Sequence, residues 1–209
     1  MANTILNTPG GNGQVPAGKV IIGNGYTGNL ATFNGKIFVM DLENLPEEPD
    51  PLNPLNLPPN TIRVRFISGY TPDMGTTRTL VDANENIWDI TTSYNGWEGL
   101  FYEQLDSNEH YLIEILGANS KNITNMSFMC YACNNLINVP LINTSSVTDV
   151  SHMFQYCRNV QHGQLNLYNQ LAPQFPEDPY ENYHYCFYQC GSNTETGRAE
   201  LEQIPIFWS

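Results

Sequence analysis

The sequence predicts an α/β protein: a short solenoid of helix–turn–strand units, preceded by a strand-rich cap and an extended N-terminal arm. Residues 122–136 and 146–160 align without a gap, 24 positions apart, and 182–193 carry a third copy 33 residues further on. Each copy is followed by an apolar stretch that suits a strand. Because no unit of this size can bury its own apolar face, such spacing is typical of stacked repeats.

The first 40 residues are predicted to form an anchoring arm. They are rich in Gly, Asn and Thr around short apolar runs such as "KVIIGNG" and "GKIFVM". This composition favours extended chain or small strands that cannot bury a core alone. We therefore expect Ile21, Ile22, Ile37 and Phe38 to anchor the arm on a partner, burying apolar area at about 25 cal/mol per Å².

Residues 41–60 are predicted to form a linker. Six prolines lie between Pro46 and Pro59, and five acidic residues lie between Asp41 and Asp50. Proline favours polyproline II and the carboxylates repel one another, so a semi-rigid extended spacer is expected. The alternative is a surface loop folded back on the domain.

Residues 61–209 are predicted to form the repeat domain. It opens with "TIRVRFIS", in which apolar residues alternate with two arginines, a pattern that indicates a half-buried strand. Turn residues and aromatic residues follow. Whether 61–96 belongs to the solenoid or forms a separate capping sheet stays open.

Each repeat shows apolar residues at i, i+3, i+4 and i+7, the spacing of one helix face. We interpret Trp97, Leu100 and Phe101 as the start of a degenerate N-terminal copy. The core positions in the three clear copies are Met126, Met129, Cys130 and Cys133; Val150, Met153, Phe154 and Cys157; and Tyr183, Cys186, Phe187 and Cys190.

The five cysteines are predicted to be packed thiols. Cys133, Cys157 and Cys190 occupy the same core-facing position of successive copies, where a small apolar side chain packs well. A zinc site, a disulfide and a redox pair are the alternatives, but zinc would need four converging ligands. No metal and no cofactor is expected.

No catalytic constellation is found, so the protein is not expected to be an enzyme. The sequence lacks a nucleophile elbow, a Walker-type loop and a Gly-rich dinucleotide loop after a strand. A glycan-active enzyme with catalytic groups on distant loops is the alternative. The stretch Asp82–Asp89 imitates a calcium loop but lacks the EF-hand glycine and glutamate, so a solvated turn is favoured over an irregular calcium site.

The charge of the chain excludes one class of partner. The formal net charge is −13, from 21 acidic residues against 8 Lys and Arg, without a basic run. Nucleic-acid binding is not expected, since it needs clustered cations. No apolar run approaches 18 residues and the first residues do not resemble a secretory signal, so neither a membrane span nor export is expected.

Tyrosine is the most suggestive residue type for ligand binding. The chain has 12 tyrosines, more than the core stripes use. Tyr131, Tyr156, Tyr180 and Tyr188 are candidates for a ligand surface, because tyrosine offers a large flat area at small entropic cost. The alternative is that these rings complete the core.

The repeats "ITNMSFMCYACNNL" and "INTSSVTDVSHMFQYC" resemble the BspA-type surface-protein repeat, a variant leucine-rich repeat. The resemblance covers about half the chain and implies a leucine-rich-repeat-like solenoid. Two departures, the few copies and the long connection over 169–182, favour a compact capped array. Such repeats occur in bacterial surface proteins and in fibre proteins of phages of gut bacteria.

An N-terminal arm followed by such a repeat is similar to the head or tail fibres of crAss-like phages that infect Bacteroides. The resemblance implies a non-enzymatic virion protein, assembled in the host cytoplasm, that decorates the head. Its expected partners are the major capsid protein or another virion protein, and a host-surface glycan or protein. The chain is also expected to form a homo-oligomer, for which a trimer is the hypothesis. A tail-fibre component and a bacterial surface adhesin or glycan-binding module are the alternatives.

Overall fold

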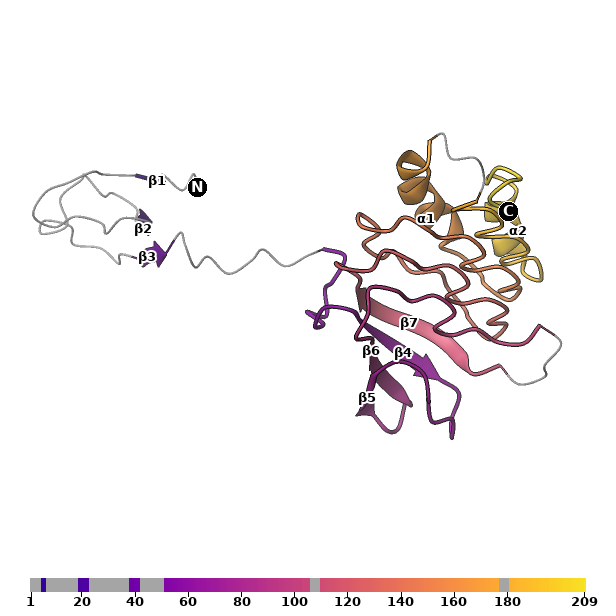
Figure 1. Cartoon of the computed structure of the whole chain (residues 1–209), viewed down its shortest axis with the longest axis horizontal. Coiled ribbons are helices and arrows are strands. Elements are labelled where there is room, and N and C mark those ends of the chain that lie inside the picture. Colours follow the sequence, from indigo (N-terminus) through magenta and orange to yellow (C-terminus); the bar gives the residue numbers. More distant parts are fainter. Residues whose placement is uncertain (1–4, 7–18, 23–37, 42–50, 106–109, 177–180) are drawn as a thin grey trace, which may run out of the picture. The chain divides into compact units, whose positions relative to one another are not determined.

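The protein divides into two compact units, Met1–Glu48 and Pro49–Ser209. The computed structural model describes residues 5–6, 19–22, 38–41, 51–105, 110–176 and 181–209 (Figure 1). Each unit is described by itself.

The first unit contains a small antiparallel sheet of three strands in the order β1-β2-β3. The strands are β1 (Ile5–Leu6), β2 (Lys19–Ile22) and β3 (Phe38–Asp41). Of the expected anchors, Ile21 and Ile22 lie on β2, and Ile22 is paired with Phe38 of β3. Ile37 lies outside the described residues. Of the two options expected for the arm, extended chain or small strands, the described residues form small paired strands.

The second unit begins with a four-stranded antiparallel sheet in the order β5-β6-β4-β7. The strand expected from residue 61 is confirmed as β4, with its alternate apolar side chains buried and its two arginines half-buried. The apolar stretch at 110–118 largely forms β7. Residues from 61 to 96 therefore contribute to a separate sheet. The strands are β4 (Thr61–Phe66), β5 (Thr77–Asp82), β6 (Ile87–Thr91) and β7 (Leu112–Asn119).

The acidic turn between β5 and β6 is a solvated turn. The Asp82 carboxylate accepts hydrogen bonds from the backbone N–H groups of Asn84 and Glu85, at 2.8 and 3.2 Å. Asp89 lies outside this turn and forms a bidentate ion pair with Arg63 at 2.7 and 2.8 Å. The carboxylates that suggested a calcium loop therefore serve the turn and the sheet separately.

The predicted fold class, a leucine-rich-repeat-like solenoid of helix–turn–strand units, is wrong. The described regular structure of the second unit is mainly the antiparallel sheet, with only two short α-helices, α1 (Gln164–Leu171) and α2 (Glu195–Leu201), and the 3₁₀ turn η2 (Ala172–Gln174). The repeats themselves consist of turns. The stretch at 160–168, expected to be a strand, leads into α1 instead.

Left-handed residues explain why the repeats are not helices. Phe128 and Ala132, four residues apart, have φ of 55° and 59°, whereas an α-helix needs a right-handed backbone throughout. The apolar spacing instead comes from consecutive turns, closed by bonds such as Met129 N–H to Met126 C=O at 3.2 Å. The equivalent residues of the later copies also have positive φ: His152, Tyr156, Tyr185 and Gln189.

The repeats stack through a backbone ladder. We define four stacked units, 97–104, 126–133, 150–157 and 183–190. The N–H groups of alternate residues in one unit donate to carbonyl oxygens of the next; Met126 donates to Asp149 and Phe128 to Ser151, at 2.8 and 2.9 Å. The last unit donates in the same way to Phe207 and Trp208, which close the stack at its C-terminal end. In Figure 1 the coils of the later units lie between β7 and the helices α1 and α2.

One apolar core runs through the second unit. It extends from the inner face of β4 through the four stacked units to Leu167 and Leu171 of α1 and to Trp208. The repeat positions expected in the core are confirmed as buried, Phe154 and Phe187 included. The start of α1 packs tightly on this end, because a Cβ at Gly163, just before α1, would lie 2.0 Å from the Val139 carbonyl oxygen.

The described half of the Pro-rich segment packs on the sheet. Leu57 is buried, and its carbonyl oxygen accepts hydrogen bonds from the side chains of Asn53 and Asn119, at 3.1 and 2.7 Å. Leu55 approaches Gly117 of β7 closely enough that a Cβ there would lie 2.7 Å from it. Residues 51–60 are thus folded back on the domain, as the alternative interpretation had it. Among the described residues, no helix is long and apolar enough to cross a membrane.

Candidate functional site

The left-handed turns of the stacked units present aromatic side chains at the protein surface. Phe128, His152 and Tyr185 occupy the same position of three successive units, and all three are half-buried with positive φ. A bulky residue in this conformation is strained by roughly 1–2 kcal/mol. Strain of this kind persists only where surrounding contacts enforce it, and it is concentrated at functional sites.

These residues belong to a continuous aromatic strip of two rows. In one row, Tyr102 stacks on Tyr131 with ring centroids 4.8 Å apart, and Tyr156 follows at 5.5 Å. In the other row, Phe128 stacks on His152 at 4.4 Å. The aromatic strip comprises Tyr102, Tyr131, Tyr156, Tyr188, Phe128, His152 and Tyr185.

The backbone and one cation hold the strip in place. Each ring is carried by a unit whose backbone is bonded to its neighbours, so the row spacing follows the ladder. The Arg158 guanidinium lies 5.2 Å from the centroid of the Tyr156 ring and donates through Nε to Gln189 at 3.1 Å. The rings are therefore preorganised, which reduces the entropy lost when a ligand binds.

The structure brings together three of the four tyrosines singled out in the sequence. Tyr131, Tyr156 and Tyr188 form consecutive edge-to-face contacts, both at 5.5 Å. Tyr180 lies outside the described residues. The three rings are half-buried, so they are surface groups and not part of the apolar core.

Sequence reasoning missed Tyr102 and the second row. The alignment of copies already placed Phe128, His152 and Tyr185 in register, so a recurring ring at a position outside the apolar stripe was the available signal. Its significance was hidden because the alignment does not show that the rings of neighbouring units lie within stacking distance. Tyr102 was missed because the first unit departs most from the repeat.

The five cysteines are free and fully buried. The Cys133 thiol donates to the Phe101 carbonyl oxygen at 2.9 Å, and the Cys157 thiol donates to that of Cys130 at 2.8 Å. Burial raises the pKa of all five thiols, and their mutual proximity generally adds to this. Such thiols are protonated and unreactive at neutral pH, so the prediction of packed thiols is confirmed.

A pocket of about 500 Å³ opens beside the first ring of the strip. Tyr102 belongs to both, and most of the pocket's lining comes from the sheet and the first stacked unit. Tyr70 and Tyr111 stack on each other there with centroids 4.1 Å apart. The side chains that matter for its chemistry are Phe66, Tyr70, Asp73, Tyr102, Glu103 and Tyr111.

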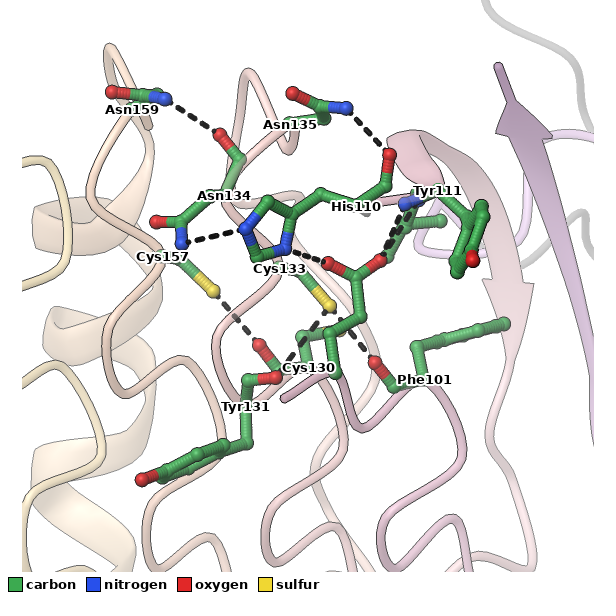
Figure 2. A network of polar contacts seen from close by, with 12 residues as sticks. Phe101, His110, Tyr111, Cys130, Tyr131, Cys133, Asn134, Asn135, Cys157 and Asn159 are labelled. Carbon is green, nitrogen blue, oxygen red and sulfur yellow. Dashed lines mark hydrogen bonds and ion pairs between the residues drawn. The ribbon is translucent and has the colours of Figure 1, made fainter. Parts of the chain in front are cut away.

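Glu103 is a buried carboxylate at the edge of this pocket. It is 8% exposed, and its Oε1 accepts hydrogen bonds from the backbone N–H groups of Tyr111 and Leu112 at 2.8 and 3.1 Å. Its Oε2 lies 2.7 Å from His110 Nδ1. Figure 2 shows His110 within this network, with its ring pointing at the Asn134 side chain.

His110 joins Glu103 to the neighbouring stacked unit. The Asn134 side chain accepts a hydrogen bond from the backbone N–H of Arg158 at 3.3 Å, and its Nδ2 lies 3.2 Å from His110 Nε2. The backbone carbonyl oxygen of His110 accepts a hydrogen bond from Asn135 Nδ2 at 2.6 Å. Both ring nitrogens of His110 therefore have a polar neighbour.

Within the described part of the chain, no group of three or more His, Cys, Asp and Glu side chains could hold a metal ion. His110 lies in the Glu103 network, His152 belongs to the aromatic strip with His184 beside it, and the exposed His162 forms a backbone bridge with Asn138. The rings of the strip and the polar side chains of the pocket are suited to holding a ligand by stacking and polar contacts.

Comparisons with models of known protein families, with characterised proteins and with solved structures found no significant match.

Proposed function

We propose that this chain is a non-enzymatic adhesion protein whose aromatic strip binds a glycan on a cell surface. The observation that carries the proposal is the strip itself, a surface row of rings repeated over four stacked units. Sugar rings have apolar C–H faces that pack on aromatic faces, and their hydroxyl groups bond to polar side chains at the rim. A strip that advances with the units suits an extended chain of sugars.

We further propose that residues 1–48 attach the protein to a larger particle, with Ile21, Ile22, Ile37 and Phe38 as anchors. The division of the chain into two units supports an attachment role for one and a display role for the other. The resemblance of the repeats to surface and fibre proteins favours a phage head, where the major capsid protein or another virion protein would be the partner, and where the chain could assemble as a homo-oligomer.

The adhesion proposal is tested by removing two rings of the strip. Tyr156→Ala with Tyr188→Ala is expected to weaken binding to purified host polysaccharides about five- to 150-fold, because each aromatic contact contributes about 0.5–1.5 kcal/mol. Binding is measured with the labelled full chain. Tyr94→Ala is the matched control, since Tyr94 is 53% exposed and lies outside the strip.

Two outcomes separate the alternatives. Unchanged binding by the double variant contradicts the assignment of the strip. Binding to intact cells that disappears after protease treatment, without binding to polysaccharide, indicates a protein receptor.

Mass spectrometry of purified particles tests where the protein is located. A copy number in the hundreds supports a head decoration, a handful of copies supports a tail fibre, and absence from the particle favours a bacterial adhesin.

A further inference from the structure

We propose that the pocket lined by Tyr70, Tyr102, Tyr111, Asp73 and Glu103 binds an organic ammonium group. This site is separate in chemistry from the glycan strip, although Tyr102 contacts both, and it does not depend on the adhesion proposal. The argument rests on the rings, the carboxylates and the absence of described cations in the lining.

The aromatic lining favours a cation. Five aromatic side chains line the pocket, and the faces of tyrosine and phenylalanine rings carry negative electrostatic potential that attracts ammonium groups within about 6 Å. Tyr70 and Tyr111 stack on each other, and Phe66 lies 5.0 Å from Tyr70, centroid to centroid. These contacts fix the rings as rigid walls. The aromatic lining residues are Phe66, Tyr70, Phe101, Tyr102 and Tyr111.

The acidic and basic side chains that line the pocket are all acidic. Asp73 and Glu103 are its two carboxylates, and among the described lining residues none is Lys or Arg. Both carboxylates act on Tyr70, whose pKa is raised first by burial and then by the charges of Asp73 and Glu103. The nearby Arg78 points its guanidinium at the backbone carbonyl oxygens of Asp73 and Met74, at 2.7 and 3.3 Å.

Glu103 fixes one acidic group at the pocket. Its Oε1 accepts hydrogen bonds from the backbone N–H groups of Tyr111 and Leu112, and its Oε2 lies 2.7 Å from His110 Nδ1. An acidic side chain held at this largely buried position, together with Asp73, favours a ligand that brings a positive charge into the pocket, whereas an anionic ligand would be repelled.

The size of the pocket suits a small ammonium compound or the end of a longer one. A cavity of about 500 Å³ is larger than a single alkylammonium group and lies in the range of small-ligand sites. Two sources share the chemistry: a quaternary ammonium such as that of choline, and a primary ammonium such as that of a lysine side chain.

Calorimetric titration of the full chain tests the proposal with choline chloride, with Nα-acetyl-lysine amide and with 3,3-dimethyl-1-butanol, the neutral isostere of choline. At least one ammonium compound is expected to bind about tenfold more tightly than the neutral alcohol, the ratio that one net cation–π or ionic contact supports. The compound that binds more tightly identifies the source. Equal binding of all three, or no binding up to about 20 mM, overturns the proposal, since even a 1 mM complex would then be saturated.

Variants locate the bound cation and separate this site from the strip. Asp73→Asn is expected to weaken ammonium binding about threefold or more without affecting the fold, because Asp73 is exposed. Glu103→Gln is expected to have a larger effect, and a thermal melt checks that it folds. Tyr156→Ala with Tyr188→Ala should leave ammonium binding unchanged. Unaltered affinity in Asp73→Asn and in a folded Glu103→Gln contradicts the assignment.

Discussion

At the scale of single residues, the unusual feature is the series of side chains that adopt a left-handed backbone. Stacking contacts offset the strain at Phe128, His152 and Tyr185. Gln189, at φ 57°, has no ring that could stack. Gln189 instead accepts a hydrogen bond from Arg158 at 3.1 Å. Its side chain therefore offsets the backbone strain by a polar contact and not by stacking.

Replacement of Gln189 tests the cost of this conformation. Gln189→Gly is expected to be more stable than Gln189→Ala by about 1 kcal/mol, because only glycine adopts positive φ without a clash of its Cβ. Both variants lose the bond to Arg158, so their difference isolates the backbone term. Urea unfolding measures it; a more stable alanine variant would contradict the positive φ.

Residue identity alone did not reveal this conformation. Glycine and asparagine are the residues that favour positive φ, and the turns around Asn56, Asn60 and Asn86 follow that rule. Phe128 and Tyr156 do not follow it, since aromatic residues carry no such preference. Burial was predictable because it depends on which positions are apolar; the backbone path was not, because the stacked neighbours impose it.

At the scale of elements, the periodicity of the repeats had two solutions. An α-helix and a series of four-residue turns both place i, i+3, i+4 and i+7 on one side. The turns prevail because half of their N–H groups donate to the next unit, a bond that an α-helix would use internally. The pattern of apolar residues describes one unit by itself, whereas the preference for turns over an α-helix depends on hydrogen bonds to the neighbouring unit. In contrast, β4 was predicted correctly, because strict alternation of apolar and polar residues is compatible with a strand and not with a helix.

The first helix depends on a glycine at its start. Gly163 has φ 104°, and a Cβ there would lie 2.0 Å from the Val139 carbonyl oxygen. Gly163→Ala must therefore displace α1 or the Val139 backbone, and its expected cost, about 3 kcal/mol or more, belongs to the severe class of single substitutions. Chemical denaturation measures the change.

Gly69→Ala is the matched control for this prediction. Gly69 also has positive φ, 83°, but a Cβ there would meet nothing within 4 Å. It should cost only the conformational term, about 1 kcal/mol. Equal destabilisation by the two variants would show that the close approach to Val139 is unimportant.

At the scale of the whole molecule, the second unit behaves as one buried core that carries two surface features. The same apolar cluster supports β4 at one end and Trp208 at the other, so the stacked units, the sheet and the helices should unfold together. The strip and the pocket are rigid because the units that carry them pack on this core. Their members come from units that are distant in sequence, which is why the sequence located individual tyrosines but neither the pocket nor the joined rows.

The five buried thiols make the stability of this core depend on alkaline pH. Unfolded thiols ionise near pH 8.5, whereas burial raises the pKa of the folded ones. The contribution of the thiols to the free energy of unfolding is complete below the pKa of the unfolded thiols. Above it the unfolded state has released more protons than the folded state, so the free energy of unfolding falls as pH rises, by about 1.4 kcal/mol per pH unit for each thiol.

Urea unfolding under reducing conditions between about pH 8 and 9.5 should therefore show a steep loss of stability that begins near the unfolded thiol pKa and precedes most tyrosine ionisation. Cys186→Ala supplies the matched comparison. The variant starts from a lower stability because it leaves a cavity, but its slope should be smaller by the share of one thiol. A flat profile in the parent protein would mean that the thiols ionise equally well when folded, and would contradict their burial. An unchanged slope in Cys186→Ala would assign the pH dependence to other groups.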